Sequence, residues 1–279
     1  MIVFPNAKIN LGLRVTARRP DGYHDLDTVF VPIALKDALE VVECPQGEGC
    51  RLHVAATDGT VLDCADADNL VARAYRLLVA EGYALPPVEV WLTKHIPSGA
   101  GLGGGSADAA FMLLVLRQMF RLPIADDVLA LLAGRLGADC PFFIFNRPLH
   151  ATGTGDRFAP LPCDPMAGLR AVVVKPPVFV STAEAFRHIV PALPDVSLPQ
   201  LLTAPAEEWR HTVTNDFETT LFPLHPELPA IKQRLYDLGA VYASMSGSGS
   251  ALYGLFASDA VPTLPTLRRT FPGCGVFSL

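Results

Sequence analysis

The stretch PSGAGLGGGS, residues 97–106, has the composition of an anion-binding loop. It lies between an alternating segment and a long apolar stretch, so the pattern predicts a strand, a loop and then a helix. Glycines let main-chain N–H groups approach an anion closely, and the first turn of a helix adds N–H groups that lack a partner. Ser106 would add a hydroxyl at that first turn. We therefore expect this loop to bind a phosphate group.

Other loop types fit this stretch less well. A Walker A loop requires a lysine after its last glycine, and none is present there. Gly99, Gly101 and Gly104 match GxGxxG, but a dinucleotide-binding fold needs a continuously apolar strand before that motif, whereas residues 88–96 alternate. The HRD and DFG motifs of protein kinases are absent. A simple tight turn between strand and helix would not need five glycines in seven positions.

The elements that position this loop belong to an N-terminal half with further alternating segments. Residues 8–15 alternate, which predicts a half-buried strand with Ile9, Leu11, Leu13 and Val15 on one face and Lys8, Asn10, Gly12 and Arg14 on the other. A Pro-Asp-Gly turn at 20–22 leads to two more strands, so this part is expected to be antiparallel. The further elements expected in this half are strands at 25–35, 37–43 and 88–96 and helices at 68–81, 106–120 and 125–137.

Local signals predict the ends and faces of these elements. Asp68 or Asn69 can cap the first helix, and Gly137 is a typical stop for the third. The second helix is apolar on nearly all sides, which predicts that it is buried. The inward-facing residues are expected to be Leu70, Ala74, Leu77 and Leu78 in the first helix and Val88, Val90 and Leu92 in the strand at 88–96.

A second half begins after a loop-rich stretch, with a new block near residue 168, so we place a domain boundary near residue 160. Ser181 and Glu184 have the spacing of a capping box at the start of a helix. The further elements expected are a helix at 226–238 and strands at 240–245, 251–256 and 274–279. The chain is therefore expected to be an α+β protein with domains at 1–160 and 161–279.

The bulk composition excludes several classes of protein. Of the 279 residues, 50% are hydrophobic and 18% charged, as in a globular protein with a sizeable core. The net charge of −6 argues against sequence-independent nucleic-acid binding, and neither a membrane span nor a signal peptide is visible. The six cysteines form no CxxC pair, which predicts reduced thiols in the cytoplasm rather than a zinc site. The expected partner is a small molecule, with no nucleic acid and no membrane.

The sequence resembles the galactokinase, homoserine kinase, mevalonate kinase and phosphomevalonate kinase (GHMP) superfamily. Residues 97–106 fit its second motif, Pro-x-x-x-Gly-Leu-Gly-x-x-Ser, and GGGSADAA at 103–110 is similar in particular to the 4-diphosphocytidyl-2-C-methyl-D-erythritol kinase family. The other matching segments are, in order, AKINLGL at 7–13, DGYH at 21–24, LGADCPFF at 136–143, NDFE at 215–218 and SMSGSGSALYGLF at 244–256. Together they cover the chain from end to end.

The resemblance implies a fold, a reaction and a phosphate site. The fold would combine an N-terminal ATP-binding domain, with helices and a mixed or antiparallel sheet, and a C-terminal ferredoxin-like domain, with the active site in the cleft between them. The reaction would transfer the γ-phosphoryl of ATP to the 2-hydroxyl of 4-diphosphocytidyl-2-C-methyl-D-erythritol, in the non-mevalonate isoprenoid pathway. The implied phosphate-binding residues are Pro97, Gly99, Ala100, Gly101, Leu102, Gly103, Gly104, Gly105, Ser106 and Ala107. Mg²⁺ would bridge the β- and γ-phosphates, and Ser106 is its candidate ligand.

Asp139 is the candidate catalytic carboxylate. It lies just past a predicted helix end among apolar residues, where a charged side chain is hard to explain as a surface residue. It would act as a general base or orient the hydroxyl, and a local cap or turn is its alternative role. The resemblance implies Lys8 as its partner, because an ammonium would stabilise both the carboxylate and the incoming alkoxide. On sequence alone, a strand lysine is usually solvated.

Recognition of the cytosine is also assigned by the resemblance. Tyr23 and Phe186 would sandwich the base, and His24 would contact its edge, although core packing is the alternative role for each aromatic. The other implied substrate contacts are Asn10, Thr182, Gly247 and Ser248. The last two belong to the SGSGS loop at 246–250, which alone could equally be a flexible hairpin.

Two departures and two other functions stand beside this assignment. Ala107 replaces a serine often found in the family, so a second hydroxyl for the metal is missing, and Lys-Pro-Pro at 175–177 replaces the usual Pro-Gly element. A homoserine or mevalonate kinase is one alternative, against which DGYH and the triple glycine argue. A ligand sensor without catalysis is the other, against which the presence of both Lys8 and Asp139 argues.

Overall fold

Two compact units make up the chain, which a computed structural model describes over residues 1–57 and 68–279. Unit 1 consists of Met1–Ala7, Ala34–Ser98 and Gly103–Arg147, and unit 2 consists of Lys8–Ile33, Gly99–Leu102 and Pro148–Leu279. Both units combine helices with sheets, which confirms the predicted α+β class. The two units are each made of several separate segments of the chain. This division does not test the predicted domain boundary near residue 160, which stays a prediction.

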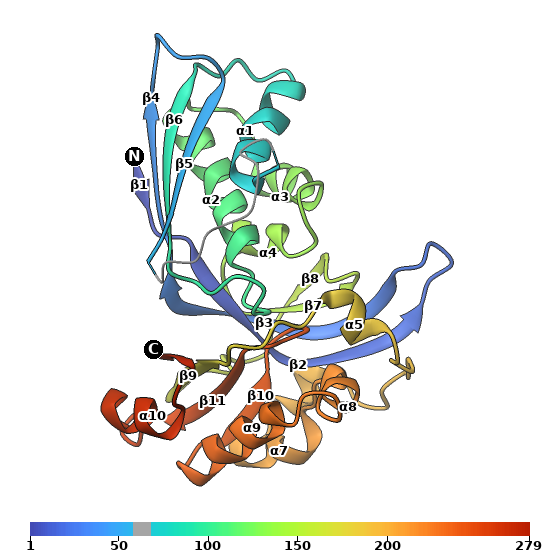
Figure 1. Ribbon diagram of the computed structural model, residues 1–279. Helices are drawn as coiled ribbons and strands as arrows, with labels where there is room; N and C mark the ends of the chain where they lie inside the picture. Colours follow the sequence, from blue (N-terminus) through green and yellow to red (C-terminus); the bar gives the residue numbers. More distant parts are fainter. Residues whose placement is uncertain (58–67) are drawn as a thin grey trace. The chain divides into compact units, whose positions relative to one another are not determined.

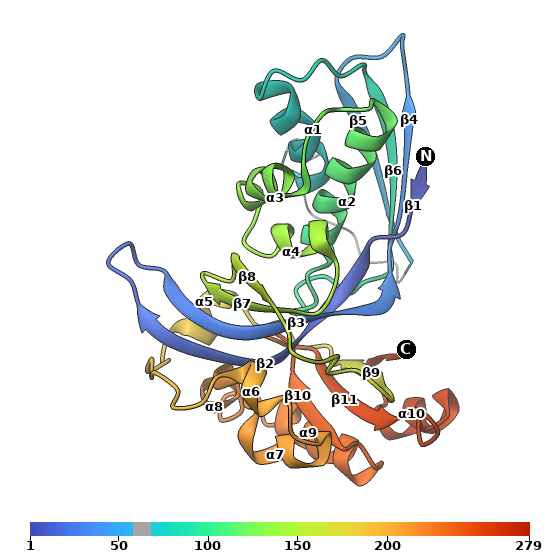
Figure 2. The same ribbon diagram turned by 180° about the vertical axis from the view of Figure 1, so that it is seen from behind.

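Unit 1 is a mixed sheet with helices on one of its faces (Figures 1 and 2). Across the sheet, the strands follow the order β1 (Ile2–Val3), β4 (Ala38–Glu43), β6 (Val88–Lys94) and β5 (Cys50–Ala56). The helices are α1 (Leu70–Ala80), α2 (Gly104–Met119), α3 (Asp126–Gly134) and α4 (Cys140–Phe145). In β6, the predicted inward-facing residues are at most 3% exposed, which confirms the alternation. β5, which pairs with β6 in parallel, has no counterpart among the predicted strands.

Two helix predictions for unit 1 are wrong in detail. In α1, Ala74 and Leu78 are buried as predicted, but Leu70 and Leu77 are only half-buried. The buried surface also contains Val71 and Tyr75, because α1 packs against both α2 and β5. α3 ends at Gly134 and not at Gly137, since the N–H groups of the next two residues turn back to carbonyls three residues earlier. Of the two capping candidates for α1, Asn69 is the cap and accepts a hydrogen bond from the Val71 N–H at 2.9 Å.

Unit 2 contains two sheets and the remaining helices (Figure 1). The first sheet has the order β2 (Asn6–Arg18), β3 (His24–Lys36), β7 (Leu149–Gly153) and β8 (Arg157–Pro160), and one end of both β2 and β3 belongs to unit 1. The second sheet is antiparallel, in the order β10 (Tyr242–Met245), β11 (Leu252–Ala257), β9 (Leu169–Lys175) and β12 (Gly275–Ser278). The helices are α5 (Thr182–Phe186), α6 (Leu198–Leu201), α7 (Trp209–Thr212), α8 (Asp216–Leu221), α9 (Glu227–Asp237) and α10 (Leu264–Thr270).

The predicted half-buried character of β2 is wrong. Residues 6–15 are all buried, so both faces of this strand are covered. The polar side chains are accommodated by partners: Arg14, for example, donates to the Val196 carbonyl at 2.6 Å and lies 3.8 Å from Asp27. Gly12 adopts a left-handed backbone (φ +72°) inside the strand, a conformation typical of a β-bulge, where simple alternation of faces stops. A polar-apolar pattern could not reveal that its polar positions are also covered.

Four cysteines of the described chain, Cys44, Cys140, Cys163 and Cys274, are free thiols. Cys64 lies outside the described residues. Among residues 1–57 and 68–279, no helix has the length and apolar character needed to cross a membrane.

Candidate active site

The glycine-rich loop runs from β6 into α2, as its sequence predicts. The helix starts at Gly104, two residues before the predicted start, because Gly103 turns the chain with a left-handed backbone (φ +71°) that glycine adopts at little cost. Gly99 and Gly101 share this handedness. No described side chain caps α2, so the N–H groups of its first turn, which includes Ser106, can face an anion.

Within unit 2, the Gly99–Leu102 part of this loop is bonded to the second glycine-containing loop, residues 246–250. The Ser246 hydroxyl donates to the Gly101 carbonyl at 2.9 Å, and the Ala251 N–H donates to the Ala100 carbonyl at 3.2 Å. A Cβ on Gly101 would lie 2.0 Å from the Ser246 carbonyl oxygen, so the two backbones are too close for any side chain there. The two loops singled out in the sequence are therefore neighbours.

Lys8 and Asn10 lie beside the loops on β2. The Lys8 N–H donates to the Leu102 carbonyl at 2.9 Å, and the Lys8 ammonium donates to Asn10 Oδ1 at 2.6 Å. The Asn10 amide in turn donates to the Thr28 hydroxyl at 2.9 Å. The ammonium also lies 5.0 Å from the centre of the Phe30 ring, within cation–π range. Lys8 is 3% exposed, so the solvated-lysine alternative is wrong.

Asn215, to which the sequence assigned no role of its own, holds the second loop in place. Its amide donates to the Met245 carbonyl at 2.8 Å and to the Gly247 carbonyl at 2.9 Å. Its Oδ1 accepts from the Phe217 N–H and caps α8. The sequence pattern, an asparagine directly before a helix, predicts that Asn215 caps that helix. It does not predict that the side-chain NH₂ of the same residue binds a loop about 30 residues further along the chain. These hydrogen bonds fix the backbone of the second loop. In that loop Gly247 is buried and Ser248 is half-buried.

Asp139, in unit 1, directly precedes α4 and is half-buried. Within the described chain its side chain makes no capping hydrogen bond to α4, so the alternative role of a helix cap is not used. Phe142 and Phe143 of that helix are fully buried and anchor it. The backbone of Asp139 is therefore held by core packing, and its carboxylate is not committed to the helix end.

Ser106 lies next to the Cys140 thiol, with which it forms a hydrogen bond. Burial raises the pKa of Cys140 to about 12, so this thiol is an unreactive neighbour. The described residues contain no group of three or more His, Cys, Asp or Glu side chains that could hold a metal ion by themselves. A hydroxyl at a phosphate loop nevertheless fits Mg²⁺, which binds largely through phosphates and keeps few protein ligands.

Of the other predicted phosphate-site residues, Pro97 is half-buried, Gly105 is exposed and Ala107 is fully buried.

The predicted base-binding residues differ in their surroundings. His24 and Phe186 stack on each other, with ring centres 4.7 Å apart and planes at 21°, and Phe186 also packs against the core of unit 2. Tyr23 is 66% exposed at the turn before β3. Thr182 is exposed at the start of α5, where Ser181 accepts from the Glu184 N–H at 3.1 Å, the first half of the predicted capping box. Thus His24 and Phe186 are brought together, whereas Tyr23 and Thr182 face solvent.

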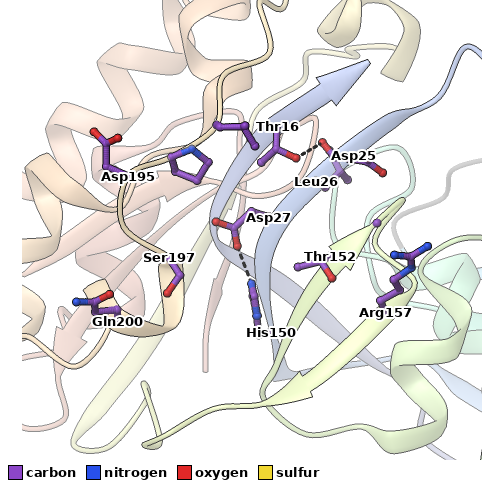
Figure 3. Close-up of a pocket in the computed structure, with 13 residues that line it drawn as sticks. Thr16, Asp25, Leu26, Asp27, His150, Thr152, Arg157, Asp195, Ser197 and Gln200 are labelled. Carbon is purple, nitrogen blue, oxygen red and sulfur yellow. Dashed lines mark hydrogen bonds and ion pairs between the residues drawn. The ribbon is translucent and has the colours of Figure 1, made fainter. Parts of the chain in front are cut away.

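A cavity of about 640 Å³ lies next to this region, entirely within unit 2 (Figure 3). Its walls come from the end of the β2–β3 hairpin, from β7 and β8, and from residues 193–200. On its floor, His150 hydrogen-bonds to Asp27 at 2.7 Å, a contact that the scattered histidines of the sequence did not suggest. None of the predicted site residues lines this cavity.

Comparison with protein families gives two matches. The model for the GHMP kinases N terminal domain matches residues 69–147, and that for the GHMP kinases C terminal matches residues 197–264. The matches fall on either side of residue 160.

Comparison with individual proteins covers the whole chain. A 4-diphosphocytidyl-2-C-methyl-D-erythritol kinase from Bacteroides thetaiotaomicron is 50% identical over 99% of this chain and 98% of its own length. A crystal structure of a 4-(cytidine 5'-diphospho)-2C-methyl-D-erythritol kinase, 37% identical, superposes with a TM-score of 0.81 over 100% of this chain and 98% of that chain. A homoserine kinase from Cytophaga hutchinsonii, 20% identical with a TM-score of 0.69 over 98% of this chain and 93% of that chain, shares the fold.

Proposed function

Because the chain belongs to the 4-diphosphocytidyl-2-C-methyl-D-erythritol kinase family of GHMP kinases, we propose that it phosphorylates the 2-hydroxyl of 4-diphosphocytidyl-2-C-methyl-D-erythritol with ATP. It is a small-molecule kinase of isoprenoid precursor biosynthesis. The observation that best supports the site is the hydrogen-bonded set formed by Lys8, Asn10, residues 99–102 and residues 246–250. A buried ammonium beside two glycine-rich loops is a suitable environment for a triphosphate.

The loops supply donors for the phosphates. Main-chain N–H groups of the first loop and of the first turn of α2 bind phosphate oxygens, and the helix dipole favours their negative charge. Phosphoryl transfer depends mainly on positioning and charge stabilisation. Asn215 contributes by fixing the second loop.

The transfer itself involves Lys8 and Asp139. The 2-hydroxyl oxygen forms a bond to the γ-phosphorus while the bond from that phosphorus to the β–γ bridging oxygen breaks, and ADP leaves. Asp139 receives the hydroxyl proton, or orients the hydroxyl, and the Lys8 ammonium stabilises the negative charge on the attacking oxygen. Asn10 keeps the ammonium oriented through the bond at 2.6 Å.

Mg²⁺, when bound, neutralises the charge of the β- and γ-phosphates. Ser106 is the side chain that would hold it from the protein side. With Ala107 in the following position, one hydroxyl is the most this turn can offer.

The cytosine ring is recognised by the aromatic residues. Tyr23 and Phe186 stack on its two faces, and His24, which packs against Phe186, contacts its edge. Thr182, Gly247 and Ser248 contribute further substrate contacts. The free thiols of Cys44, Cys140, Cys163 and Cys274 support a reducing compartment, the cytoplasm.

An ATP-consumption assay that offers 4-diphosphocytidyl-2-C-methyl-D-erythritol, homoserine and mevalonate in parallel tests this function. Turnover with the first and only background rates with the others is expected. Preference for homoserine or mevalonate would make the chain a different GHMP kinase. Tight ATP-analogue binding with no turnover of any alcohol would favour the sensor.

A further inference from the structure

A buried charge cluster lies in unit 1, outside the site described above. Lys94 is the last residue of β6, Asp37 directly precedes β4, and Asp108 lies in α2. Their side chains are 8%, 0% and 3% exposed. The Lys94 ammonium donates to Asp108 Oδ2 at 2.6 Å and also to Asp37 Oδ2. One cation thus joins two carboxylates in the interior of the unit.

The cluster holds both ends of the glycine-rich loop. Asp37 Oδ1 accepts from the N–H groups of His95 and Ile96, the residues just before the loop. Asp108 lies one turn beyond Gly104, where the loop has become helix. A Cβ on Gly104 would lie 2.9 Å from Ile96 Cγ2 and 3.3 Å from Lys94 Nζ, so the two ends of the loop pack closely against each other.

The charges of these three residues are not expected to stabilise the fold more than apolar residues would. Among the described residues, Asp108 Oδ1 is a buried side-chain oxygen without a hydrogen-bond partner, which is costly. Burial is the main cause that raises the pKa of Asp108 to about 7, with Asp37 adding to the shift and Lys94 opposing it. Apolar residues of similar volume are often as stabilising as buried ion pairs, so the defined geometry is the property that apolar residues would not supply.

We propose that Lys94, Asp37 and Asp108 are positioning residues that fix the two ends of the phosphate loop at the separation that a bound triphosphate requires. They act through the backbone at residues 95–96 and 104–108 and do not touch the substrate. The proposal rests on the proposed function in one respect: it takes residues 97–106 as the loop that binds phosphate. The phosphate-binding N–H groups are useful only while the loop keeps its shape, and among the described residues no side chain caps the start of α2 at Gly103.

Asp37→Ala and Asp37→Asn test this arrangement as a pair. Asparagine can still accept from both N–H groups through Oδ1, whereas alanine leaves them unpaired. We expect Asp37→Ala to raise the KM for ATP at least tenfold and to change the KM for the alcohol substrate less than twofold, and Asp37→Asn to restore most of the ATP affinity. Arg117→Met is the control, because Arg117 lies near the other end of α2 and pairs with Asp126 at 2.6 Å. Its ATP KM should stay unchanged even if its Tm falls.

A second variant covers the case in which Asp37→Ala does not fold. Asp37→Asn/Lys94→Met/Asp108→Leu removes every charge of the cluster and keeps the acceptor at position 37, so it should fold, but it no longer ties β6 to α2. A tenfold or larger loss of ATP affinity is expected. Unchanged ATP affinity in this variant, or a fall in Tm with both KM values at the wild-type level, would overturn the proposal.

Calorimetric binding of adenylyl imidodiphosphate with Mg²⁺ separates this proposal from the proposed function. If the wild-type chain binds this analogue but phosphorylates none of the alcohols, the proposed function fails. The ratio of variant to wild-type Kd still decides the role of the cluster. If the wild-type chain does not bind the analogue, both ideas are wrong.

Discussion

Two regions of unit 2 that would contact the substrates differ in how firmly they are held. The loop region, comprising Lys8, Asn10 and residues 99–102 and 246–250, is tied by hydrogen bonds between main chain and side chains, and its Lys8 and Asn10 are at most 3% exposed. The aromatic region, comprising Tyr23, His24, Thr182 and Phe186, has one stacked pair and two solvent-exposed side chains.

This difference separates positioning for the reaction from recognition of the substrate. Groups that are already aligned stabilise charge in the transition state without reorganising, so their loss lowers kcat. Groups that become ordered only with the ligand contribute binding energy minus the entropy of ordering, so their loss raises KM. Variants in the two regions, and in the proposed catalytic residue Asp139, are therefore expected to give different kinetic signatures.

The largest effect is expected for Asp139→Ala. Because this change removes the group that receives or orients the hydroxyl proton, kcat should fall by roughly three orders of magnitude or more. Nucleotide affinity should stay within about twofold, since the phosphate N–H groups are unchanged. Steady-state kinetics together with calorimetric binding of an ATP analogue measures both quantities. A near-normal kcat would remove Asp139 from the mechanism and leave the loop region to act alone.

A smaller effect is expected for Gly101→Ala, which tests the rigidity of the loop region. The new Cβ would lie 2.0 Å from the Ser246 carbonyl oxygen, and the residue would need a left-handed backbone (φ +73°), so the two loops must separate. Because the aligned groups are displaced, kcat should fall and the KM for ATP should rise, each by about tenfold to a hundredfold. Gly134→Ala is the matched control, because Gly134 lies outside the predicted site and the nearest atom to its Cβ, Pro141 Cγ, is at an ordinary contact distance of 3.6 Å. Equal KM values for the two variants would mean that contact between the loops is irrelevant to ATP binding.

The loop region was largely predictable from sequence, because its glycines and its neighbouring strand leave local signals. Gly99, Gly101 and Gly103 adopt the backbone that their residue type favours, and β6 alternates as expected. Contacts between residues far apart in the sequence, such as that between Lys94 of β6 and Asp37, were not predictable in the same way. Lys94 and Asp37 are 57 positions apart, and each is an ordinary charge next to a strand end until the fold buries both. β5 was missed because Cys50–Ala56 has a weak pattern, with Leu52 as its one fully buried residue.

In the aromatic region, Tyr23→Ala should have a moderate effect that is confined to one substrate. Stacking of a base on an aromatic ring contributes about 1–3 kcal/mol, which corresponds to roughly thirtyfold in KM at the middle of that range. Because Tyr23 is 66% exposed, its loss should leave the Tm nearly unchanged. KM for the cytidyl substrate and for ATP, measured separately, checks this. An equal rise for both would show that Tyr23 serves the nucleotide site as well, and that the two regions are not distinct.

The last effect is measured in stability rather than in kinetics, and it concerns pH and the charge cluster that holds the ends of the phosphate loop. Burial raises the pKa of Asp108 to about 7, whereas an aspartate in the unfolded chain titrates near 4. Between about pH 4 and pH 7 the folded chain therefore holds more protons than the unfolded chain, so the free energy of unfolding falls as pH rises through this window, by at most about 1.4 kcal/mol per pH unit.

Asp108→Asn removes this titration and should flatten that slope, which urea unfolding at pH 5, 6, 7 and 8 can measure. Asp126→Asn is the control, because that carboxylate belongs to the same unit but has a side chain that is 63% exposed. Its slope should match the wild type. If Asp108→Asn kept the wild-type slope, the carboxyl group would be ionised throughout this pH range, and the loop ends would be held by a cluster with a net negative charge.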